Sequence, residues 1–387
     1  MIKDETTRKI AIVYDWIDKW GGVERILLDI HEMFPEAVFY TSYFDKTKAG
    51  WAKNLKIKTS FLQKFPDFIK KSRILSFIFY PFVFESFNFS EYDLVISVTS
   101  SFAKSIITKP GTQHICYLLT PTRYLWTHRQ DYIKNKSIDY LIDGYLKLFE
   151  NWDLTVSQRP DKIISISETV KKRCKKYYKR ESDVIYPGFN IEYWKKIKYQ
   201  ISKIKNQESK IQFKNKKYFL IVSRLEQYKK VDLAIKVFNK LDENLVIVGE
   251  GSQADKLKQI AGKKITFLAK LSDNELGGLY SNAQALIMPQ EEDFGLVSLE
   301  AQFFGCPVIA YNKGGATETI IDGKTGMFFN QQKKNGLVRA IERFNKIKYN
   351  LRTKVKEFGT SNVEKFAKDK FVNKFVELVK NGYMVIL

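Results

Sequence analysis

Short apolar runs that alternate with helical patterns along most of the chain are the feature that most constrains its fold. In the first half the strand-like runs are 9–16, 37–43, 93–99, 114–120, 162–167 and 182–188. A second set begins at 218–225 and continues with NLVIVGEG, ITFLAKL, AQALIMP, PVIAY and TGMFF. Strands that alternate with helices form parallel sheets. The pattern therefore predicts an α/β protein with two successive Rossmann-like halves and a cleft between them.

A lysine-rich stretch separates the two halves. Residues 195–217 are poor in apolar side chains, and we interpret them as the domain junction or an exposed connection. The predicted domains are 1–190 and 191–369, with a C-terminal helix, 370–387, that packs back on the first domain. A chain of 387 residues is long enough for two full cores.

The net charge of +22 leaves several explanations open. A basic surface attracts nucleic acid or anionic lipid, whereas abundant Lys, Ile, Asn, Phe and Tyr are also typical of AT-rich genomes. The lysines form no single stripe, and no usual nucleic-acid-binding motif is present. The segment 64–89 sets Lys70, Lys71 and Arg73 beside many aromatic residues, which can place a segment in a membrane interface. A core helix with a solvated lysine face is the alternative.

The cysteines and the longest apolar runs indicate the cellular compartment in which the protein is expected. Cys116, Cys174 and Cys306 are far apart and suggest neither a disulfide framework nor a metal cluster, which favours the reducing cytosol. The N-terminal MIKDETTRKIAIVYDW lacks the apolar run of a signal peptide, and the apolar stretch 74–84 is short for a bilayer span and contains a proline. We expect a cytoplasmic protein that is peripheral at the inner face of the membrane.

Two glutamates mark the stretch QEEDFGLVSLEAQFFGCPVIA. Glu292 lies in the predicted loop after the strand AQALIMP, and Glu300 lies about one turn inside a predicted helix, 296–304. Gly305 and Pro307 follow where a helix ends. A buried carboxylate needs hydroxyls or a cation as partners, so Glu300 either meets such partners or points outward on a solvated face. The local pattern leaves both interpretations open.

Cations and paired glycines follow other predicted strands. Arg224 lies at the end of the apolar run 218–225 and Lys229 five residues further on, where they suit an anion such as a diphosphate, and a surface pair is the alternative. The pairs Gly21–Gly22 and Gly314–Gly315 each open a helix after a strand, where backbone amides can meet phosphate. The dinucleotide fingerprint G-x-G-x-x-G is absent.

Taken together, these motifs resemble the retaining, nucleotide-sugar-dependent glycosyltransferases of family 4, which have the GT-B fold. The matching pieces are GGVER, YDLVISVTSSFAK, TPTRYLW, SRLEQYKKVDLAIKVF, EDFGLVSLE and GGATETIIDGKTG, in the family's order. The resemblance implies two Rossmann-like domains with a deep interdomain cleft, the first for the acceptor and the second for the donor.

The resemblance also implies roles for individual residues. Glu300 is expected to bind the donor ribose, Glu292 to lie beside the transferred sugar, and Arg224 with Lys229 to stabilise the departing diphosphate. Further donor contacts are implied for Phe294, Gly295, Leu296, Gly22 and Gly21. Leu119, Arg123 and Tyr124 are implied in the acceptor or sugar pocket. No D-x-D motif is present, so no metal or cofactor is expected. The co-substrate is a nucleotide-diphosphate sugar, GDP-mannose or a UDP-sugar.

Leu119 departs from the family pattern, which often has a histidine just before TP. Ser223 also replaces a common glycine before the arginine. We expect a transferase that moves a hexose, mannose first, to a lipid-linked oligosaccharide or polysaccharide acceptor in cell-envelope biosynthesis. The alternatives are a catalytically weak nucleotide-sugar-binding homologue that acts as a partner protein, and an anionic-membrane or nucleic-acid binder.

Overall fold

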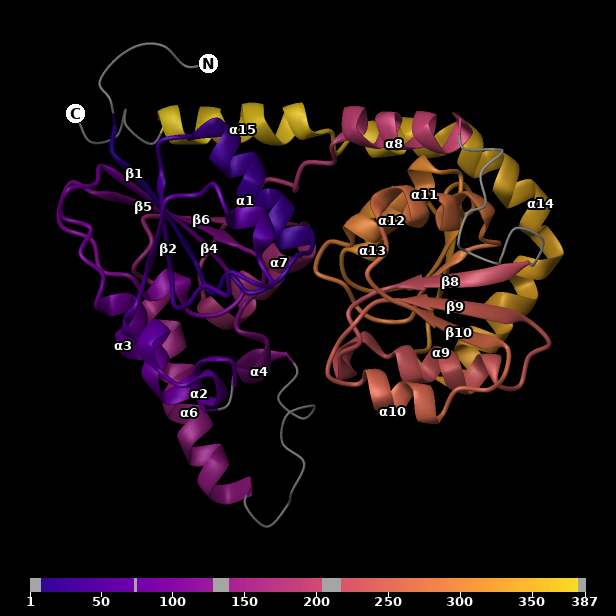
Figure 1. Cartoon of the computed structure of the whole chain (residues 1–387), viewed down its shortest axis with the longest axis horizontal. Coiled ribbons are helices and arrows are strands. Elements are labelled where there is room, and N and C mark those ends of the chain that lie inside the picture. Colours follow the sequence, from indigo (N-terminus) through magenta and orange to yellow (C-terminus); the bar gives the residue numbers. More distant parts are fainter. Residues whose placement is uncertain (1–7, 73–74, 128–138, 204–216, 382–387) are drawn as a thin grey trace. The chain divides into compact units, whose positions relative to one another are not determined.

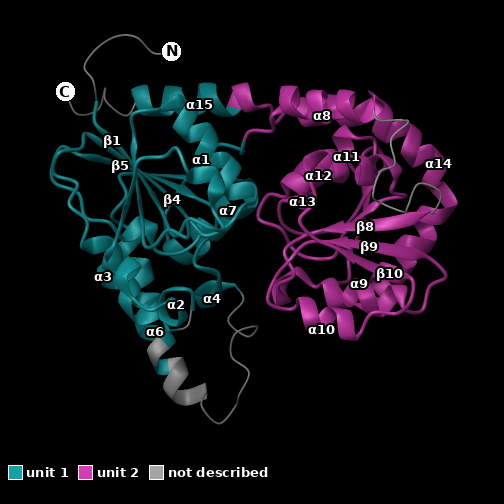
Figure 2. Cartoon of the chain, viewed as in Figure 1, with its two compact units in different colours: residues 1–187, 371–387 teal, residues 188–370 magenta. Residues whose placement is uncertain are grey.

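The computed structural model describes residues 8–72, 75–127, 139–203 and 217–381. The chain divides into two compact units, residues 1–187 with 371–387 (unit 1) and residues 188–370 (unit 2), which Figure 2 distinguishes by colour. Each unit has its own sheet and helices and is described by itself. Arg73, His128, the middle of the predicted connection at 204–216, and the end of the predicted C-terminal helix at 382–387 lie outside the described residues.

Unit 1 is built on a parallel sheet whose described strands follow the order β3-β2-β1-β4-β5-β6-β7 (Figure 1). The strands are β1 Ile10–Tyr14, β2 Val38–Thr41, β3 Ile57–Thr59, β4 Leu94–Thr99, β5 Gln113–Leu118, β6 Lys162–Ser165 and β7 Asp183–Val184. Ile12 of β1 lies opposite Phe39 of β2 and Ile96 of β4. The predicted strand 182–188 is thus reduced to β7, because Pro187 cannot donate to a ladder and Gly188 favours a turn.

Helices connect these strands. They are α1 Gly22–Met33, α2 Asp67–Lys70, α3 Tyr80–Glu85, α4 Arg123–Trp126, α6 Asp139–Val156, α7 Glu168–Arg173 and α15 Lys368–Asn381, with shorter turns η1 Gly50–Ala52, η2 Phe61–Lys64, η3 Phe77–Phe79, η4 Ala103–Ser105 and η5 Cys174–Tyr178. The helix α15 packs on the sheet, since the rings of Phe371 and Phe375 lie 5.9 and 5.8 Å from that of Tyr117 in β5. The predicted C-terminal helix 370–387 thus begins slightly earlier, at Lys368.

The segment 64–89 contributes to the core of unit 1. Phe77, Tyr80, Val83, Phe84 and Phe89 are buried and pack in one cluster with strand residues of β1, β2 and β4. Other apolar side chains of the same segment are exposed and are considered below. The burial of Phe77 and its partners in that cluster supports the core alternative, and the contact with a membrane stays a prediction.

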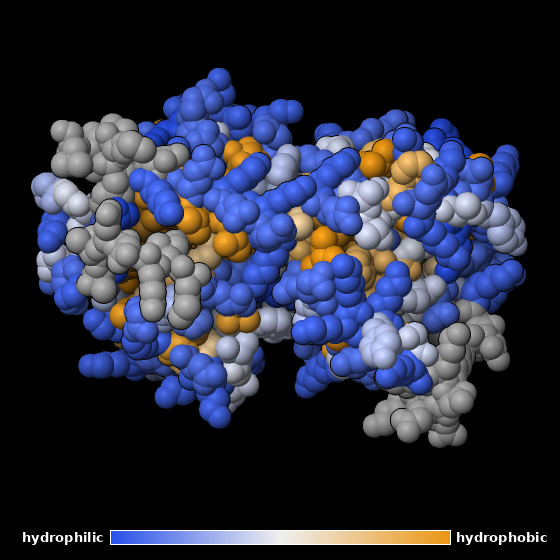
Figure 3. All heavy atoms as spheres, turned by 90° about the horizontal axis from the view of Figure 1, so that it is seen from above, coloured by the Kyte–Doolittle hydropathy of each residue, from blue (hydrophilic) through white to orange (hydrophobic). Residues whose placement is uncertain are grey.

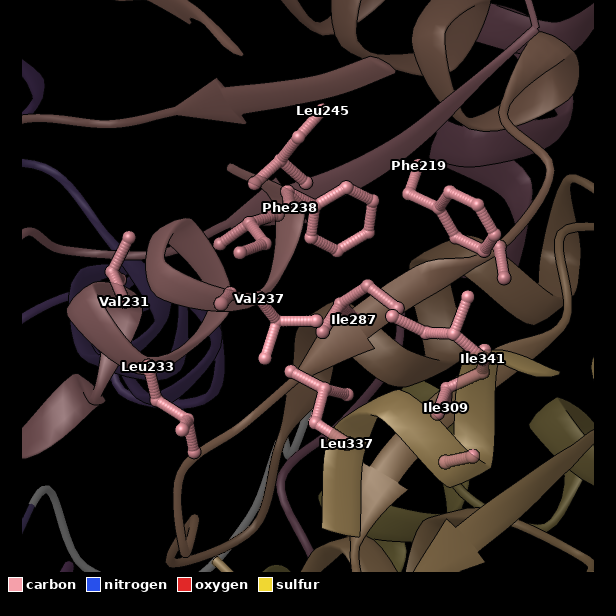
Figure 4. Close-up of a cluster of buried hydrophobic side chains, with 14 of the residues drawn as sticks. Phe219, Val231, Leu233, Val237, Phe238, Leu245, Ile287, Ile309, Leu337 and Ile341 are labelled. Atoms are coloured by element: carbon pink, nitrogen blue, oxygen red, sulfur yellow. The ribbon is translucent and has the colours of Figure 1, made fainter. Parts of the chain in front are cut away.

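Unit 2 holds a second parallel sheet, whose described strands follow the order β10-β9-β8-β11-β12-β13. They are β8 Tyr218–Val222, β9 Asn244–Val248, β10 Ile265–Leu268, β11 Leu286–Met288, β12 Val308–Tyr311 and β13 Gly326–Phe329. The helices are α8 Ile191–Lys203, α9 Val231–Phe238, α10 Ala254–Gln259, α11 Asp273–Asn282, α12 Leu296–Phe303, α13 Ala316–Thr319 and α14 Lys334–Glu364, with the turn η6 Gln227–Lys229. Figure 4 shows the core, where side chains of α9 and α14 meet those of β8, β9, β11 and β12.

The expected exposed connection at 195–217 is wrong for its first part, because residues 191–203 form helix α8. Trp194 and Ile197 are buried although lysines surround them in the sequence, and the Trp194 ring lies 5.7 Å from that of Phe304. Apolar side chains at this i, i+3 spacing form one stripe of a helix, which packs while the lysines face solvent.

The face drawn in Figure 3 carries mostly hydrophilic residues, with hydrophobic residues in smaller groups between them. No described helix combines the length and the apolar character needed to cross a membrane. The three cysteine thiols are buried and unbonded to one another, and burial raises the pKa of Cys116 and Cys306 to about 12.

Candidate active site

In unit 2 the strand order reverses between β8 and β11, which run side by side although they are not consecutive in the chain. Open α/β sheets bind ligands at such a switch point, beyond the carboxyl ends of the strands. The loop after β8 carries Arg224 and Lys229, and the loop after β11 carries Glu292. The fold therefore brings the predicted cations and the first glutamate to one edge of the sheet.

An ion pair joins these two loops. The Nζ of Lys229 lies 2.5 Å from Oε1 of Glu292, and the two side chains are only 10% and 16% exposed. The Nε2 of Gln290 donates to the same oxygen at 2.6 Å. Burial alone would raise the pKa of Glu292, but the nearby Lys229 ammonium and the hydrogen bonds from Lys229 and Gln290 hold it below its ordinary value. Glu292 is therefore ionised at neutral pH and partners a buried cation.

Tyr228 lies between the two cations, and the sequence analysis did not single it out. Its hydroxyl accepts a hydrogen bond from Nη2 of Arg224 at 2.5 Å. The Arg224 guanidinium and the Lys229 ammonium lie 5.9 and 5.3 Å from the centre of its ring. Because aromatic faces attract cations, Tyr228 helps to hold both charges near the switch point. Its place in the run RLEQYKK is the signal that could have identified it.

Glu300 is buried, so the interpretation of an outward-facing carboxylate is wrong. Its Oε2 accepts a hydrogen bond from the hydroxyl of Tyr280 in α11 at 2.8 Å. The Tyr280 ring stacks on Phe304 at 6.0 Å. The helix α12 ends at Phe303, one residue earlier than predicted, and Gly305 follows shortly after with a φ of 74°, in the left-handed region that favours glycine after a helix. Glu300 thus meets a hydroxyl, the kind of partner that a buried carboxylate needs.

The residues between the two glutamates present backbone rather than side chains. The Phe294 side chain is buried, with its ring 5.4 Å from that of Phe366. Gly295 precedes α12 with a φ of 97°, in the left-handed region, and Leu296 begins the helix. The first amides of a helix lack partners within it. Here the Ser298 N–H donates to the Gly295 carbonyl at 3.0 Å, so the amides of Leu296 and Val297 are the ones that can receive an anionic or hydroxyl-bearing ligand.

The loop at Gly314–Gly315 packs directly against Glu292. A Cβ at Gly314 would lie 2.2 Å from the carbonyl oxygen of Glu292, so only glycine fits there. The N–H of Gly315 donates to that same carbonyl at 2.7 Å. This amide therefore positions the Glu292 loop, and contact between phosphate and the other amides of this turn stays a prediction.

In unit 1 the strand order reverses between β1 and β4, and the predicted pair Gly21–Gly22 lies beyond the carboxyl end of β1. Gly22 begins α1. Glu24 is buried in the first turn and accepts a hydrogen bond from the Tyr14 hydroxyl at 3.2 Å. A Cβ at Gly21 would lie 3.1 Å from Oε2 of Glu24. A carboxylate here offsets the positive end of the helix dipole, which makes this turn less attractive to phosphate than a bare helix N-terminus.

The predicted pocket residues Leu119, Arg123 and Tyr124 follow β5 in the same unit. Leu119 is buried and donates its N–H to the carbonyl of Thr99 at 2.8 Å. Arg123 and Tyr124 begin α4, and the Tyr124 hydroxyl hydrogen-bonds to Ser101. His114 is buried against Ser97 at 2.8 Å, and burial lowers its pKa to about 3, so it stays neutral inside the sheet.

A buried charge network supports this segment, and sequence reasoning missed it. The Nζ of Lys104 lies 2.5 Å from Oδ1 of Asp153, with exposures of 1% and 0%. Asp153 also accepts from Thr122 Oγ1 at 3.0 Å, Trp126 Nε1 at 2.7 Å and Tyr178 OH at 3.0 Å. The network ties the segment TPTRYLW to helix α6 and to the turn η5. No described group of three or more His, Cys, Asp or Glu side chains is arranged to hold a metal ion.

Known proteins resemble this chain in sequence and in structure. Residues 202–362 match the family model described as Glycosyl transferases group 1. The Alpha-1,3/1,6-mannosyltransferase ALG2 of Dictyostelium discoideum is 25% identical, with 90% of this chain and 91% of that protein covered. The sucrose-phosphate synthase of Thermosynechococcus elongatus superposes with a TM-score of 0.72 at 16% identity, covering 98% and 100% of the two chains. Anabaena HepE in complex with UDP gives 0.68 at 16% identity, covering 96% and 100%. These likenesses show the GT-B fold.

Proposed function

We propose that this chain, which belongs to the group 1 glycosyltransferases and is therefore a glycosyltransferase, is a retaining hexosyltransferase. In this proposal unit 2 is the donor domain, and unit 1, with the C-terminal helix packed on it, is the acceptor domain. The acceptor is a lipid-linked oligosaccharide or a polysaccharide. Mannose is the favoured sugar because the relative ALG2 is named a mannosyltransferase. GDP-mannose is the first donor to test, and a UDP-sugar is the second, since HepE is described with UDP and with UDP-glucose.

The observation that carries the proposal is the placement of Arg224, Lys229 and Glu292 at the switch point of unit 2. As the bond from the sugar to the diphosphate breaks, negative charge develops on the departing phosphate. Preorganised cations at that place stabilise the transition state more than the ground state. Arg224 offers a planar fork of donors and Lys229 a compact charge, which together suit a diphosphate.

The two glutamates take different roles in this proposal. Glu300 accepts hydrogen bonds from the ribose hydroxyls, in exchange for or in addition to the Tyr280 hydroxyl that it now accepts. Glu292 lies beside the transferred sugar. Its contact with Lys229 holds the ammonium of that lysine at the sheet edge until the donor arrives.

Isothermal calorimetry with UDP, GDP, UDP-glucose and GDP-mannose tests the donor assignment. We expect one nucleotide series to bind the wild-type chain and Glu300→Ala to weaken that binding. Asp255→Ala removes an exposed carboxylate of α10 in the same unit and should leave the affinity unchanged. Analysis of the product anomer by NMR then tests retention. A wild-type chain that binds none of the four ligands would contradict the donor assignment.

Leu119 supports a second candidate, a catalytically weak nucleotide-sugar binder. It is apolar and buried at the position where the family often has a histidine. In an active transferase Leu119→His should change rate or sugar preference only modestly, because Arg224 and Lys229 supply most of the stabilisation. In a weak binder, wild type should bind nucleotide without transfer, and Leu119→His should raise activity from the background. Parallel transfer assays distinguish the two.

Peripheral attachment to an anionic membrane is the last part of the proposal. Phe68, Leu75, Ile78 and Phe82 are between 50% and 68% exposed on the segment 64–89 of unit 1. Lys71 in the same segment pairs with Asp67 and Asp45. The attachment that we propose therefore depends on the exposed apolar side chains rather than on the charge of Lys71. Insertion of such side chains at the headgroup boundary would hold the enzyme near a lipid-linked acceptor.

Liposome flotation tests this attachment. Wild type should float with vesicles that contain phosphatidylglycerol, and Phe68→Ser/Phe82→Ser should remain at the bottom of the gradient. Tyr349→Ser, which removes an aromatic side chain 77% exposed on α14 of unit 2, is the matched control and should float like wild type. Equal behaviour of wild type and the double variant would remove this surface from the proposal.

A further inference from the structure

An exposed tryptophan lies at the ligand-binding edge of unit 1. Trp20 belongs to the loop between β1 and α1, directly before the glycine pair and beyond the switch point between β1 and β4. Its side chain is 48% exposed. Tryptophan has a large apolar surface and is rarely left so open without a partner to cover it.

The structure holds this ring in place. The Trp51 ring of η1 lies 6.2 Å from the Trp20 ring at an angle of 54°. The Nε1 of Trp51 donates to the carbonyl of Lys19 at 2.6 Å, which fixes the backbone immediately before Trp20. The Arg25 guanidinium lies 5.9 Å from the centre of the Trp20 ring. A positioned aromatic face loses little conformational entropy when a ligand covers it.

A carboxylate belongs to the same loop. Asp18 comes two residues before Trp20, and its side chain is 16% exposed and lies 3.6 Å from Nζ of Lys19. It also accepts a hydrogen bond from the Tyr43 hydroxyl at 2.7 Å. A pyranose ring has one face of C–H groups and a rim of hydroxyls. An aromatic side chain with a guanidinium beside it and a carboxylate in the same loop therefore complements a sugar better than it complements a hydrocarbon chain.

The neighbouring Glu24 argues against a phosphate ligand in this loop. Its carboxylate occupies the first turn of α1 and lies close to Gly21. A neutral, hydroxyl-bearing ligand avoids the repulsion that a phosphate would meet there.

We propose that Trp20, supported by Trp51 and Arg25, forms with Asp18 of the same loop an acceptor subsite that stacks on a sugar ring. This inference rests on the proposed function and adds to it that the acceptor presents a hexopyranose to unit 1, rather than binding through a lipid or an alcohol alone. Trp20 recognises the apolar face of the sugar, and Asp18 and Arg25 recognise its hydroxyls.

Fluorine NMR of the full chain labelled with 5-fluorotryptophan tests the subsite without any transfer reaction. The chain has six tryptophans, and Trp20→Phe assigns the resonance of Trp20 by its loss. The probes are the methyl glycosides of mannose, glucose, galactose and N-acetylglucosamine. We expect at least one of them to shift the Trp20 and Trp51 resonances saturably, while Trp194, buried in unit 2, does not move. A Trp20 resonance that ignores all four glycosides overturns the proposal, and a shift with phosphatidylglycerol vesicles alone assigns the ring to the membrane instead.

Kinetics supply the second measurement. With the acceptor identified by product analysis, Trp20→Ala should raise the acceptor KM about tenfold, the loss expected for one aromatic contact, with a smaller change in kcat. Trp20→Phe should recover part of the difference, and the exposed Tyr349→Ala in unit 2 should match wild type. An unchanged KM in Trp20→Ala rejects the subsite. Calorimetry with UDP and GDP on the same samples reports on the proposed function separately, because nucleotide binding without a glycoside response rejects the subsite alone.

Discussion

Replacing Lys104 by methionine should destabilise unit 1 more than any exposed charge substitution in it. Lys104 and Asp153 are 1% and 0% exposed, so the substitution leaves a carboxylate buried without its cation. Breaking a fully buried pair in this way typically costs 3–5 kcal/mol. Asp153 keeps the donors of Thr122, Trp126 and Tyr178. We therefore place the loss at the lower end, about 3 kcal/mol.

The melting of unit 1 reports this loss. For a unit of this size 1 kcal/mol corresponds to a shift of about 2–4 °C, so Lys104→Met should lower the unit 1 transition in calorimetry by about 6–12 °C. Hydrogen exchange should accelerate in the segment 119–126, because Thr122 and Trp126 lose an ordered partner. Asp153→Asn added to Lys104→Met should recover part of the loss, since the buried charge is then gone.

The matched control is Lys162→Met. Lys162 pairs with Asp183 at 3.0 Å, but the two side chains are 44% and 67% exposed. Exposed pairs contribute at most about 1 kcal/mol, so this variant should melt close to wild type. If Lys104→Met also melts close to wild type, or if both variants fall equally, the network does not anchor the segment as we describe.

Four shorter predictions concern unit 2. Glu300→Ala should weaken nucleoside diphosphate binding by about 1.5–3 kcal/mol for each ribose hydrogen bond lost, and unchanged calorimetry would remove Glu300 from the donor site. Arg224→Ala should lower kcat by about 10²–10³ in a transfer assay, and full activity would contradict its role at the leaving group. Turnover should persist in excess EDTA, whereas loss that Mg²⁺ or Mn²⁺ restores would reveal a metal requirement. Because the folded pKa of Glu292 lies below its ordinary 4.5, its stabilisation is present above that pH and lost as pH falls through the folded value. Glu292→Gln should thus be less stable than wild type at neutral pH and approach it in acid, and a constant difference in urea denaturation between pH 7 and pH 3 would refute this.

The sequence predicted those features of the fold that depend on local pattern. The apolar runs of β8, β11 and β12 are short and bounded by turn residues, and Arg224, Lys229 and Glu292 lie in the loops that follow β8 and β11. In parallel sheets such positions converge on one edge whatever the rest of the chain does. The placement of these residues could therefore be predicted without knowing any tertiary contact.

Features that depend on distant partners could not be predicted in this way. The burial of Glu300 requires Tyr280, which belongs to another helix, and the pairing of Lys104 with Asp153 joins residues 49 positions apart. The lysine-rich composition of 195–203 also made α8 hard to predict, because only two of the helix's side chains, Trp194 and Ile197, are buried apolar ones. The glycine pair Gly314–Gly315 likewise gave no sign that the Gly315 N–H bonds to the Glu292 carbonyl.

In the proposed donor site, the contact between Glu292 and Lys229 means that donor binding exchanges one anion for another. Without a donor, Lys229 already has a counter-charge in the Glu292 carboxylate. A diphosphate would therefore gain only the difference between two attractions to Lys229, its own and that of the carboxylate. We expect such a site to bind nucleotide moderately and to release it readily. A substitution at Glu292 should then alter product release as well as the transfer itself.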